Sequence, residues 1–490
     1  IVCDAAVKFQ GCCLNDQIHC GPNLMAKVSS VLNRMRKNRI ALVSDLAEMF
    51  LQVKLLERDQ WYHMFMFETL EGELLVWKFT SHCFGSTASP CIAMFTCKER
   101  AKELALEDGN FARAAETVIN SVIMDDTCDS VDTIDEAKDL VQKLTKIYRQ
   151  SGMVCHKWVT NSKVVLETIP EAARAPNAVI CEKLDPGGQL MIHKGLGIHW
   201  LPVEDVYVYL FKIELPAEGA WTKRVLLKFY ASVYDPIGHL SPIIVLARSL
   251  YQACWKMGLE WDEIIPNAKF QAVLTQWAKS LNDLATFKIP RCLKPADNIV
   301  TTDYIVFCNA SEVAYGAAMY VRHRTVRGEV FSRLVGLRAR VAAVKKPSIP
   351  RLELLGAVLA VGMTKQIAKD LNFNLSDVYF FTDSLNVLCW LNSSKPLKQF
   401  VCNRVRKILG HTSVSQWSHV AGEINIADVV SRGCTATDLI QNELWWSGPK
   451  FLQGPLSDWP SDRDAHVGKP VQLSKRNCMA SPWQLEKNLI

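Results

Sequence analysis

Three aspartates follow apolar segments in the first third of the chain. Asp45 comes after the strand-like run 40–44, and Asp125 and Asp126 close the apolar run 118–124 about eighty residues later. Gathering three carboxylates costs free energy unless a cation neutralises them. Two divalent cations with oxygen ligands would do so and would form a clamp for in-line phosphoryl transfer. Taken alone, an Asp-Asp pair after a strand is also typical of a turn or a helix cap.

Length and composition restrict the classes of protein that fit. The 490 residues suit about three domains, and 49% hydrophobic with 22% charged residues is typical of folded globular domains rather than disordered or fibrous chains. A net charge of +6 permits contact with a polyanion without requiring it. The longest apolar run, 354–363, is too short to span a membrane, which needs about 20 residues. We therefore expect no membrane partner.

The 17 cysteines are scattered, form no Cys-x-x-Cys pair and follow no signal peptide, so reduced thiols and an intracellular protein are expected. The cluster of Cys12, Cys13 and Cys20 with His19 lacks zinc-finger spacing. Because the chain opens with Ile1 in what reads as the middle of a strand, we expect it to be a piece of something longer.

Hydrophobic periodicity predicts the elements that would position the aspartates. In the α+β region 1–165 we expect strand, turn and strand over 39–53, a hairpin of 61–67 and 74–79, a helix over 89–105, a strand over 118–124 and a helix over 132–151. Residues 170–188 read as a linker, 196–215 as a hairpin and 221–284 as mostly helical. From 303 onward we expect three strands (304–308, 314–321, 329–340), then a helix (352–371), a strand (377–382), helices (384–391, 397–409), a strand (415–419) and a helix (426–431). That last order describes a mixed sheet covered by helices.

Four ordered blocks resemble the palm of a reverse transcriptase, specifically that of Bel-Pao long-terminal-repeat retrotransposons. The blocks are SDLAEMFLQV (44–53), FGSTASP (84–90), IMDD (123–126) and LGIHW (196–200). Two further segments, DPIGHLSP (235–242) and LEWD (259–262), resemble the region that follows this palm. The resemblance implies an α+β and α/β multidomain fold: truncated fingers and palm (1–165), palm hairpin, thumb and connecting region (166–295), a ribonuclease H-like domain (296–435) and a spacer tail toward an integrase (436–490).

The resemblance also assigns roles to single residues. Asp45, Asp125 and Asp126 match the acidic residues that hold two Mg²⁺ ions at the polymerase site. The resemblance further implies a set of substrate-binding residues, namely Phe50, Phe84, Gly85, Lys157 and Trp200. Phe50 would exclude a ribose 2′-hydroxyl by steric contact. Phe50 and Trp200 are equally compatible with core packing.

Two departures from the family pattern concern the polymerase half. Ile123 stands where the family has an aromatic residue, and this should mainly alter packing beneath the turn. The basic residues with which the family's fingers grip the triphosphate lie upstream of the segment matching 2–4. We therefore expect weakened nucleotide affinity in this chain.

The third module resembles the ribonuclease H domain of the same elements through FCNAS (307–311), RLEL (351–354), FTDS (381–384) and HVAGE (419–423) with Asp428. Such domains use four carboxylates around two Mg²⁺ ions to activate water. Glu353, Asp383 and Asp428 match three of them, but the neutral Asn309 replaces the aspartate that bridges both ions. We expect hybrid binding to survive better than cleavage and Asn309→Asp to restore cleavage. Glu353 alone could also be a helix N-terminal charge.

The leading hypothesis is an RNA-directed DNA polymerase with an impaired ribonuclease H domain, from a retrotransposon pol polyprotein. Its partners would be an RNA template, a DNA primer, RNA:DNA hybrid and deoxynucleoside triphosphates, with integrase and protease of the same polyprotein as further candidates, in a cytoplasmic particle or the nucleus. The alternative is a catalytically inactive nucleic-acid-binding remnant. An aspartic peptidase is disfavoured because neither Asp-Thr-Gly nor Asp-Ser-Gly occurs.

Overall fold

The computed structural model describes residues 4–176, 193–195, 197–211, 213–345 and 347–460. The chain divides into two compact units: unit 1 takes residues up to 196 with 201–205, and unit 2 takes 197–200 and the residues from 206 onward. Within the described ranges, no helix is long and apolar enough to cross a membrane. The expected interior of the linker (177–188) and the end of the spacer tail (461–490) lie outside the described residues.

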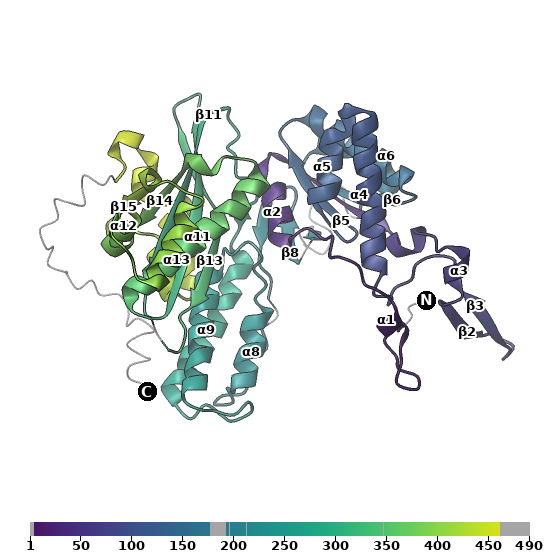
Figure 1. Cartoon of the computed structure of the whole chain (residues 1–490), viewed down its shortest axis with the longest axis horizontal. Coiled ribbons are helices and arrows are strands. Elements are labelled where there is room, and N and C mark those ends of the chain that lie inside the picture. The colour runs from purple at the N-terminus through teal and green to yellow at the C-terminus, as the bar shows by residue number, and fades with distance from the viewer. Residues whose placement is uncertain (1–3, 177–192, 196, 212, 346, 461–490) are drawn as a thin grey trace, which may run out of the picture. The chain divides into compact units, whose positions relative to one another are not determined.

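Unit 1 is built on a four-stranded antiparallel sheet in the order β4-β5-β1-β6, with helices packed around it (Figure 1). Its core joins apolar residues of β1 to those of α4, α5 and α6. The strands of unit 1 are β1 (Ile40–Ala47), β2 (Met64–Glu68), β3 (Leu74–Lys78), β4 (Val122–Ile123), β5 (Asp126–Val131), β6 (Val154–Thr160) and β7 (His193–Gly195). The helices are α1 (Leu14–Gln17), α2 (Val28–Lys37), α3 (Glu57–Gln60), α4 (Ser89–Glu107), α5 (Ala112–Asn120), α6 (Ile134–Gln150) and α7 (Lys163–Thr168).

Two strand predictions in unit 1 are wrong. The second strand expected within 39–53 is a short 3-10 helix, Met49–Gln52, which begins after Glu48 turns the chain at φ +48°. The strand expected over 118–124 is mostly the end of α5, and only Val122–Ile123 is extended. The buried residues Ala114, Ala115 and Val118 recur at helical spacing, so the apolar run belongs to one face of a helix.

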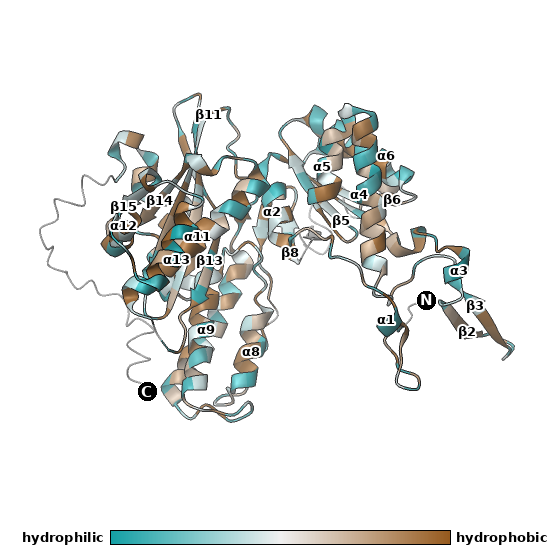
Figure 2. Cartoon of the chain, in the orientation of Figure 1, coloured by the Kyte–Doolittle hydropathy of each residue, from teal (hydrophilic) through white to brown (hydrophobic). Residues whose placement is uncertain are grey.

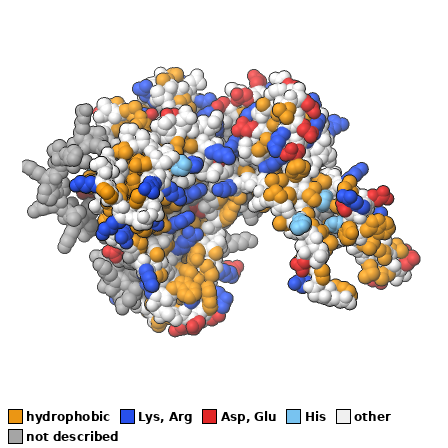
Figure 3. Space-filling view, viewed as in Figure 1, with side chains coloured by type: hydrophobic (Ala, Val, Ile, Leu, Met, Phe, Trp, Pro, Cys, Tyr) orange, Lys and Arg blue, Asp and Glu red, His pale blue; other side chains and the backbone are white. Residues whose placement is uncertain are grey.

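The other elements expected in unit 1 are confirmed. Helix α6 starts with a capping box, in which Thr133 and Glu136 satisfy each other's backbone amides, and it buries the apolar face predicted for it. The hairpin β2–β3 forms with Gly72 at φ +81°. Figure 2 shows mostly hydrophobic residues along this hairpin. Figure 3 shows hydrophobic side chains gathered on the same arm. Met66, Val76 and Trp77 are 69%, 68% and 53% exposed.

Unit 2 begins with the short strands β8 (Ile198–Leu201) and β9 (Val206–Val208), followed by helices α8 (Lys223–Ser232), α9 (Ser241–Lys256) and α10 (Ala268–Ser280) and by β10 (Ile289–Pro290), which pairs with β9. The turn between α8 and α9 is fixed by Asp235, whose carboxylate accepts hydrogen bonds from the amides of Gly238 (3.0 Å) and Leu240 (2.8 Å). Gly238 lies at φ +94°, and a Cβ there would come within 3.0 Å of the Leu337 carbonyl oxygen. Only glycine allows this turn to pack against the neighbouring strand.

The remainder of unit 2 is a mixed five-stranded sheet, as the sequence predicts, and its strand order is β13-β12-β11-β14-β15. Antiparallel pairs join β11 to β12 and β12 to β13, whereas β14 runs parallel to both β11 and β15. The strands are β11 (Ile299–Ala310), β12 (Ala314–Thr325), β13 (Val330–Val341), β14 (Val378–Thr382) and β15 (Trp417–His419). The helices are α11 (Ile349–Leu371), α12 (Leu385–Leu391), α13 (Gln399–Leu409), α14 (Ala427–Arg432), α15 (Ala436–Gln441) and α16 (Glu443–Ser447).

Candidate active site in unit 1 and carboxylate group in unit 2

The strand pairing of unit 1 brings together the aspartates singled out from the sequence. Asp45 on β1 lies directly opposite Asp126 on β5, so their side chains emerge on the same face of the sheet. Asp125 precedes β5 in a tight turn, where Met124 takes φ +56° and the Leu46 amide donates to the Asp125 carbonyl oxygen at 3.0 Å. Residues eighty positions apart in the sequence thus lie on adjacent strands of one sheet.

The pKa values of this group are those of crowded carboxylates. Burial, and next the charges of Asp125 and Asp45, raise the pKa of Asp126 to about 6. Burial also raises the pKa of Asp125, and the charge of Asp45 adds to that rise against the opposing effects of a backbone hydrogen bond and of Lys157. A nearby cation would relieve this repulsion.

Two basic side chains already contact Asp45. Because β6 pairs with β1, His156 lies beside Asp45, with its Nε2 2.6 Å from Oδ1. A register shift between Val43 and Asp45 and φ +51° at Lys157 accompany this pairing, and the Lys157 ammonium donates to Oδ2 of Asp45 at 3.2 Å. Sequence reasoning did not predict the contact of His156 with Asp45, because nothing in the neighbouring sequence reveals which strand β6 pairs with.

The donor atoms suit a hard divalent cation, because all three side chains offer carboxylate oxygens. Among the described residues, however, no three His, Cys, Asp or Glu side chains are already close enough to hold a metal ion. For Asp45, Asp125 and Asp126, the lack of a preformed metal site agrees with the contacts that both Asp45 carboxylate oxygens make with His156 and Lys157. The set therefore fits Mg²⁺ by chemistry, provided that Asp45 exchanges its basic partners for the cation.

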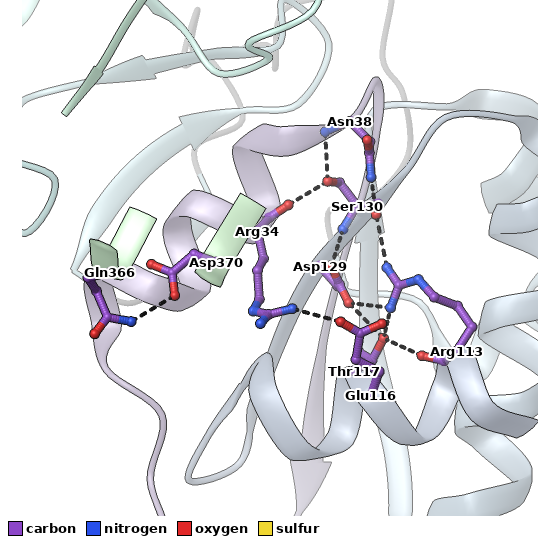
Figure 4. A network of polar contacts seen from close by, with 9 residues as sticks. All are labelled: Arg34, Asn38, Arg113, Glu116, Thr117, Asp129, Ser130, Gln366 and Asp370. Carbon is purple, nitrogen blue, oxygen red and sulfur yellow. Dashed lines mark hydrogen bonds and ion pairs between the residues drawn. The ribbon is translucent and has the colours of Figure 1, made fainter. Parts of the chain in front are cut away.

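A buried polar network fixes the strand that carries Asp126 (Figure 4). Asp129, three residues further along β5, is only 3% exposed and accepts hydrogen bonds from Arg113 Nη1 (2.9 Å), Thr117 Oγ1 (2.6 Å) and the Ser130 amide (2.8 Å). Burial would raise the pKa of Asp129, but the Arg113 charge and these hydrogen bonds lower it below its ordinary value. The network ties β5 to α5 and so holds the acidic turn in place.

The expected nucleotide-contacting residues Phe50, Phe84 and Gly85 come together. The rings of Phe50 and Phe84 lie 5.1 Å apart at 57°, and Phe84 is 40% exposed. Gly85 follows at φ +101°, and its carbonyl oxygen accepts a hydrogen bond from Asn15 Nδ2 at 2.9 Å. Phe50 is partly buried against the core of unit 1. It therefore combines core packing with a place beside an exposed ring.

The remaining two expected substrate residues differ in setting. Lys157 is half exposed and reaches the first carboxylate group through Asp45. Trp200 lies on β8 in unit 2 with 1% of its surface exposed, so the structure places it in the core, one of the two readings that the sequence left open.

The second acidic group forms at the ends of β11 and β14. Parallel pairing of Cys308 with Thr382 puts the next residues, Asn309 and Asp383, at neighbouring strand ends. Helix α11 supplies Glu353, and it approaches so closely that a Cβ on Gly356 would lie 3.0 Å from the Asn309 carbonyl oxygen. Helix α14 supplies Asp428, which accepts a hydrogen bond from Asn309 Nδ2 at 3.0 Å.

Glu353 and Asp428 of this second group have protein partners, whereas Oδ1 of Asp383 is buried without a hydrogen-bond partner among the described residues. The Ser384 hydroxyl donates to Glu353, and the Arg432 Nε donates to Asp428 at 2.7 Å. Burial raises the pKa of Asp383 to about 6, with a further contribution from the charge of Glu353. The described residues contain no ready metal site here either.

A family model matches part of unit 2. Residues 222–384, about a third of the chain, match the model of the Pao retrotransposon-like RNaseH-like domain. This stretch is similar to that domain. The match includes Asn309, Glu353 and Asp383 and ends before Asp428. It confirms over these residues the Bel-Pao resemblance drawn from the sequence.

Solved structures extend the comparison to the fold of most of the chain. A foamy viral protease-reverse transcriptase dRH in complex with double-stranded DNA is similar at a TM-score of 0.52 and 15% identity, covering 86% of this chain and 62% of that one. The foamy viral protease-reverse transcriptase in complex with RNA/DNA hybrid gives 0.48 at 15% identity, covering 82% and 46%. The first similarity confirms a multidomain reverse transcriptase fold.

The chain therefore spans about 62% of the length of that foamy viral structure. No curated protein sequence matches the chain.

Proposed function

We propose that this chain is an RNA-directed DNA polymerase that copies element RNA into DNA, part of a Bel-Pao pol polyprotein. The observation that carries the proposal is the pairing of Asp45 with Asp126 on adjacent strands of the palm sheet, with Asp125 in the turn beside them and with the charge of Asp45 contributing to the raised pKa of both Asp125 and Asp126. In the proposal these residues hold two Mg²⁺ ions, which would supply the charge stabilisation that phosphoryl transfer requires.

The protein residues around the metal ligands have separate tasks in this proposal. Phe50 and Phe84 form one side of the nucleotide site, where Phe50 rejects a ribose by steric contact. His156 and Lys157 contact the two oxygens of Asp45 until substrate and cations arrive. Lys157 is half exposed and long enough to turn toward a triphosphate once Asp45 has released it.

We propose that the nucleic-acid partners are an RNA template, a DNA primer and their hybrid. Helix α13 has no acidic residue and exposes Arg406 and Lys407, while α11 exposes Lys365 and Lys369. Figure 3 shows Lys and Arg side chains gathered on the visible face of unit 2. Basic side chains of this kind bind phosphates without regard to sequence. The RNaseH-like domain would thus bind duplex while cleaving it poorly.

The test of the polymerase proposal is primer extension on an RNA template with deoxynucleoside triphosphates and Mg²⁺. Asp125→Asn should reduce extension at least ~100-fold, because it removes a charge that no other side chain replaces. Asp139→Asn is the matched control, since Asp139 lies on the exposed side of α6 in a surface pair with Lys143. Equal extension by both variants would refute the proposal.

A second candidate is a nucleic-acid-binding remnant without catalysis. The observation that favours it is that both oxygens of Asp45 are taken by basic side chains. The remnant predicts template-primer binding with no extension at any Mg²⁺ concentration, so the same assay separates the two functions.

A further inference from the structure

The Asn309 amide presents its hydrogen-bond donors, rather than an oxygen, to the carboxylates of unit 2. Its Nδ2 donates to Asp428 Oδ1 at 3.0 Å, and its Oδ1 accepts from the Ala310 amide at 2.6 Å. A flipped amide would set two oxygens against each other at Asp428 and two N–H groups against each other at Ala310. With Asn309 only 5% exposed, both contacts fix the orientation.

An N–H bond of the Asn309 amide therefore points to a carboxylate oxygen that a cation would need as a ligand. An Asn that merely ligated weakly would direct its carbonyl oxygen toward the other ligands. The Asn309 amide instead donates a hydrogen bond to Asp428 and so stabilises the carboxylate, as a nearby positive charge would. Arg432 completes that role, because its guanidinium lies 2.7 Å from the same carboxylate.

We propose that the acidic group of the RNaseH-like domain is closed to divalent cations, with the Asn309 amide and the Arg432 guanidinium standing in for the metal ion at Asp428. The hydroxyl of Ser384 satisfies Glu353 in the same way. The sequence predicts only a loss of RNA cleavage. The proposal goes further, because it states that the site does not bind the divalent cations. It concerns unit 2 alone and does not require polymerase activity in unit 1.

Asn309 should contribute more than Arg432. Asn309 is itself buried, whereas the side chains of Arg432 and Asp428 are 58% and 36% exposed, and exposed pairs of this kind are weak. Asn309→Asp would remove two donors and add a bridging carboxylate, which is the ligand that two close cations need. Arg432 would still compete with the ion for Asp428, so one substitution should open the site incompletely.

Iron-directed backbone cleavage gives a site-specific test in the full chain. Fe²⁺ takes the place of Mg²⁺ at oxygen-ligand sites, and with ascorbate and peroxide it cuts the backbone near the ion, so that mass spectrometry of the fragments locates it. The chain as it stands should show no cuts near residues 309, 353, 383 and 428. Asn309→Asp should produce them, and Asn309→Asp with Arg432→Ala should produce them at an Fe²⁺ concentration about two- to fivefold lower, the range expected for an exposed ion pair.

Cuts at these positions in the unmodified chain would overturn the proposal. So would their absence in both Asn309→Asp variants, because the ion would then be excluded by something else. Equal Fe²⁺ requirements in the single and double variants would overturn the part assigned to Arg432. Cuts near residues 45 and 125 report separately on the proposed polymerase site, so a failure there leaves the inference about unit 2 standing.

A second measurement covers the case in which the added carboxylate prevents folding. Hydrogen exchange of peptides spanning β11 and α14 is compared with and without millimolar Mg²⁺ in the unmodified chain and in Asp428→Asn. A closed site predicts no Mg²⁺-dependent protection in either protein, with faster exchange in Asp428→Asn because its donors lose their charged acceptor. Mg²⁺-dependent protection that Asp428→Asn abolishes would overturn the proposal.

Discussion

Asp129 lies outside the acidic turn, and its replacement should most clearly lower the stability of the palm. Asp129→Asn keeps the size of the side chain but removes the charge that faces Arg113, and one of its two oxygens becomes a donor. Hydrogen bonds to a charged group contribute about 1.5–3 kcal/mol each. Three such bonds end on Asp129, but the Arg113 side chain is 42% exposed and can be solvated, so we expect a net loss of about 2 kcal/mol in unit 1.

The assay is thermal unfolding, monitored by hydrogen exchange of peptides from β5. This readout reports on unit 1 alone. A loss of about 2 kcal/mol corresponds to a midpoint lowered by roughly 4–8 °C for a unit of this size. Asp139→Asn, which removes an exposed pair, should change the midpoint by less than about 2 °C. A shift for Asp129→Asn no larger than that of the control would show that the network does not hold β5.

The same network has a definite pH dependence. Because the pKa of Asp129 is lowered in the folded state, its contribution to stability is present above the unfolded pKa, near 4, and is lost as the pH falls through the folded pKa. Asp129→Asn should therefore flatten the acid limb of the stability curve of unit 1. An unchanged acid limb would contradict the assigned direction.

Three further outcomes follow from single residues. Gly238→Ala should destabilise unit 2 by about 2 kcal/mol or more, because Gly238 has a positive φ and lies close to the Leu337 carbonyl oxygen. The control Gly362→Ala, in an open position of α11, should be neutral or stabilising by up to about 1 kcal/mol. Equal melting shifts of the two variants would refute this prediction. Phe50→Val should raise incorporation of ribonucleotides relative to deoxyribonucleotides in single-nucleotide extension, and unchanged selectivity would leave Phe50 with a packing role only. Burial raises the pKa of Asp235 to about 6, so unit 2 should gain stability as the pH falls from 7 to 5, a gain that Asp235→Asn should remove.

The elements of the RNaseH-like sheet could be predicted from sequence because each strand and helix is long and strongly patterned. The strands expected around 304–340 proved to be β11, β12 and β13, and the helix expected over 352–371 is α11 with three more residues. In unit 1 the apolar run 118–124 misled, because a short buried segment is compatible with either a strand or a helix. Packing against the sheet favours the helix, α5, over a strand for most of this run.

In the candidate sites, too, some features could be predicted from the sequence and others depend on the fold. The meeting of Asp45 with Asp126 was expected from the family resemblance, and the strand register places the two opposite each other. The contact of His156 with Asp45 depends on a strand pairing that no local pattern encodes. Likewise, the substitution at Asn309 is visible in the sequence, but the direction in which its amide points is a property of the fold.

The central claim, that Asp45, Asp125 and Asp126 form a template-directed nucleotidyl transfer site, is tested most directly by single-turnover addition of one nucleotide to a DNA primer on an RNA template. The claim predicts Mg²⁺-dependent addition of the nucleotide complementary to the template, abolished by chelation and by Asp126→Asn. A chain that binds the template-primer but adds no nucleotide, or that adds it equally well after Asp126→Asn, would contradict the claim.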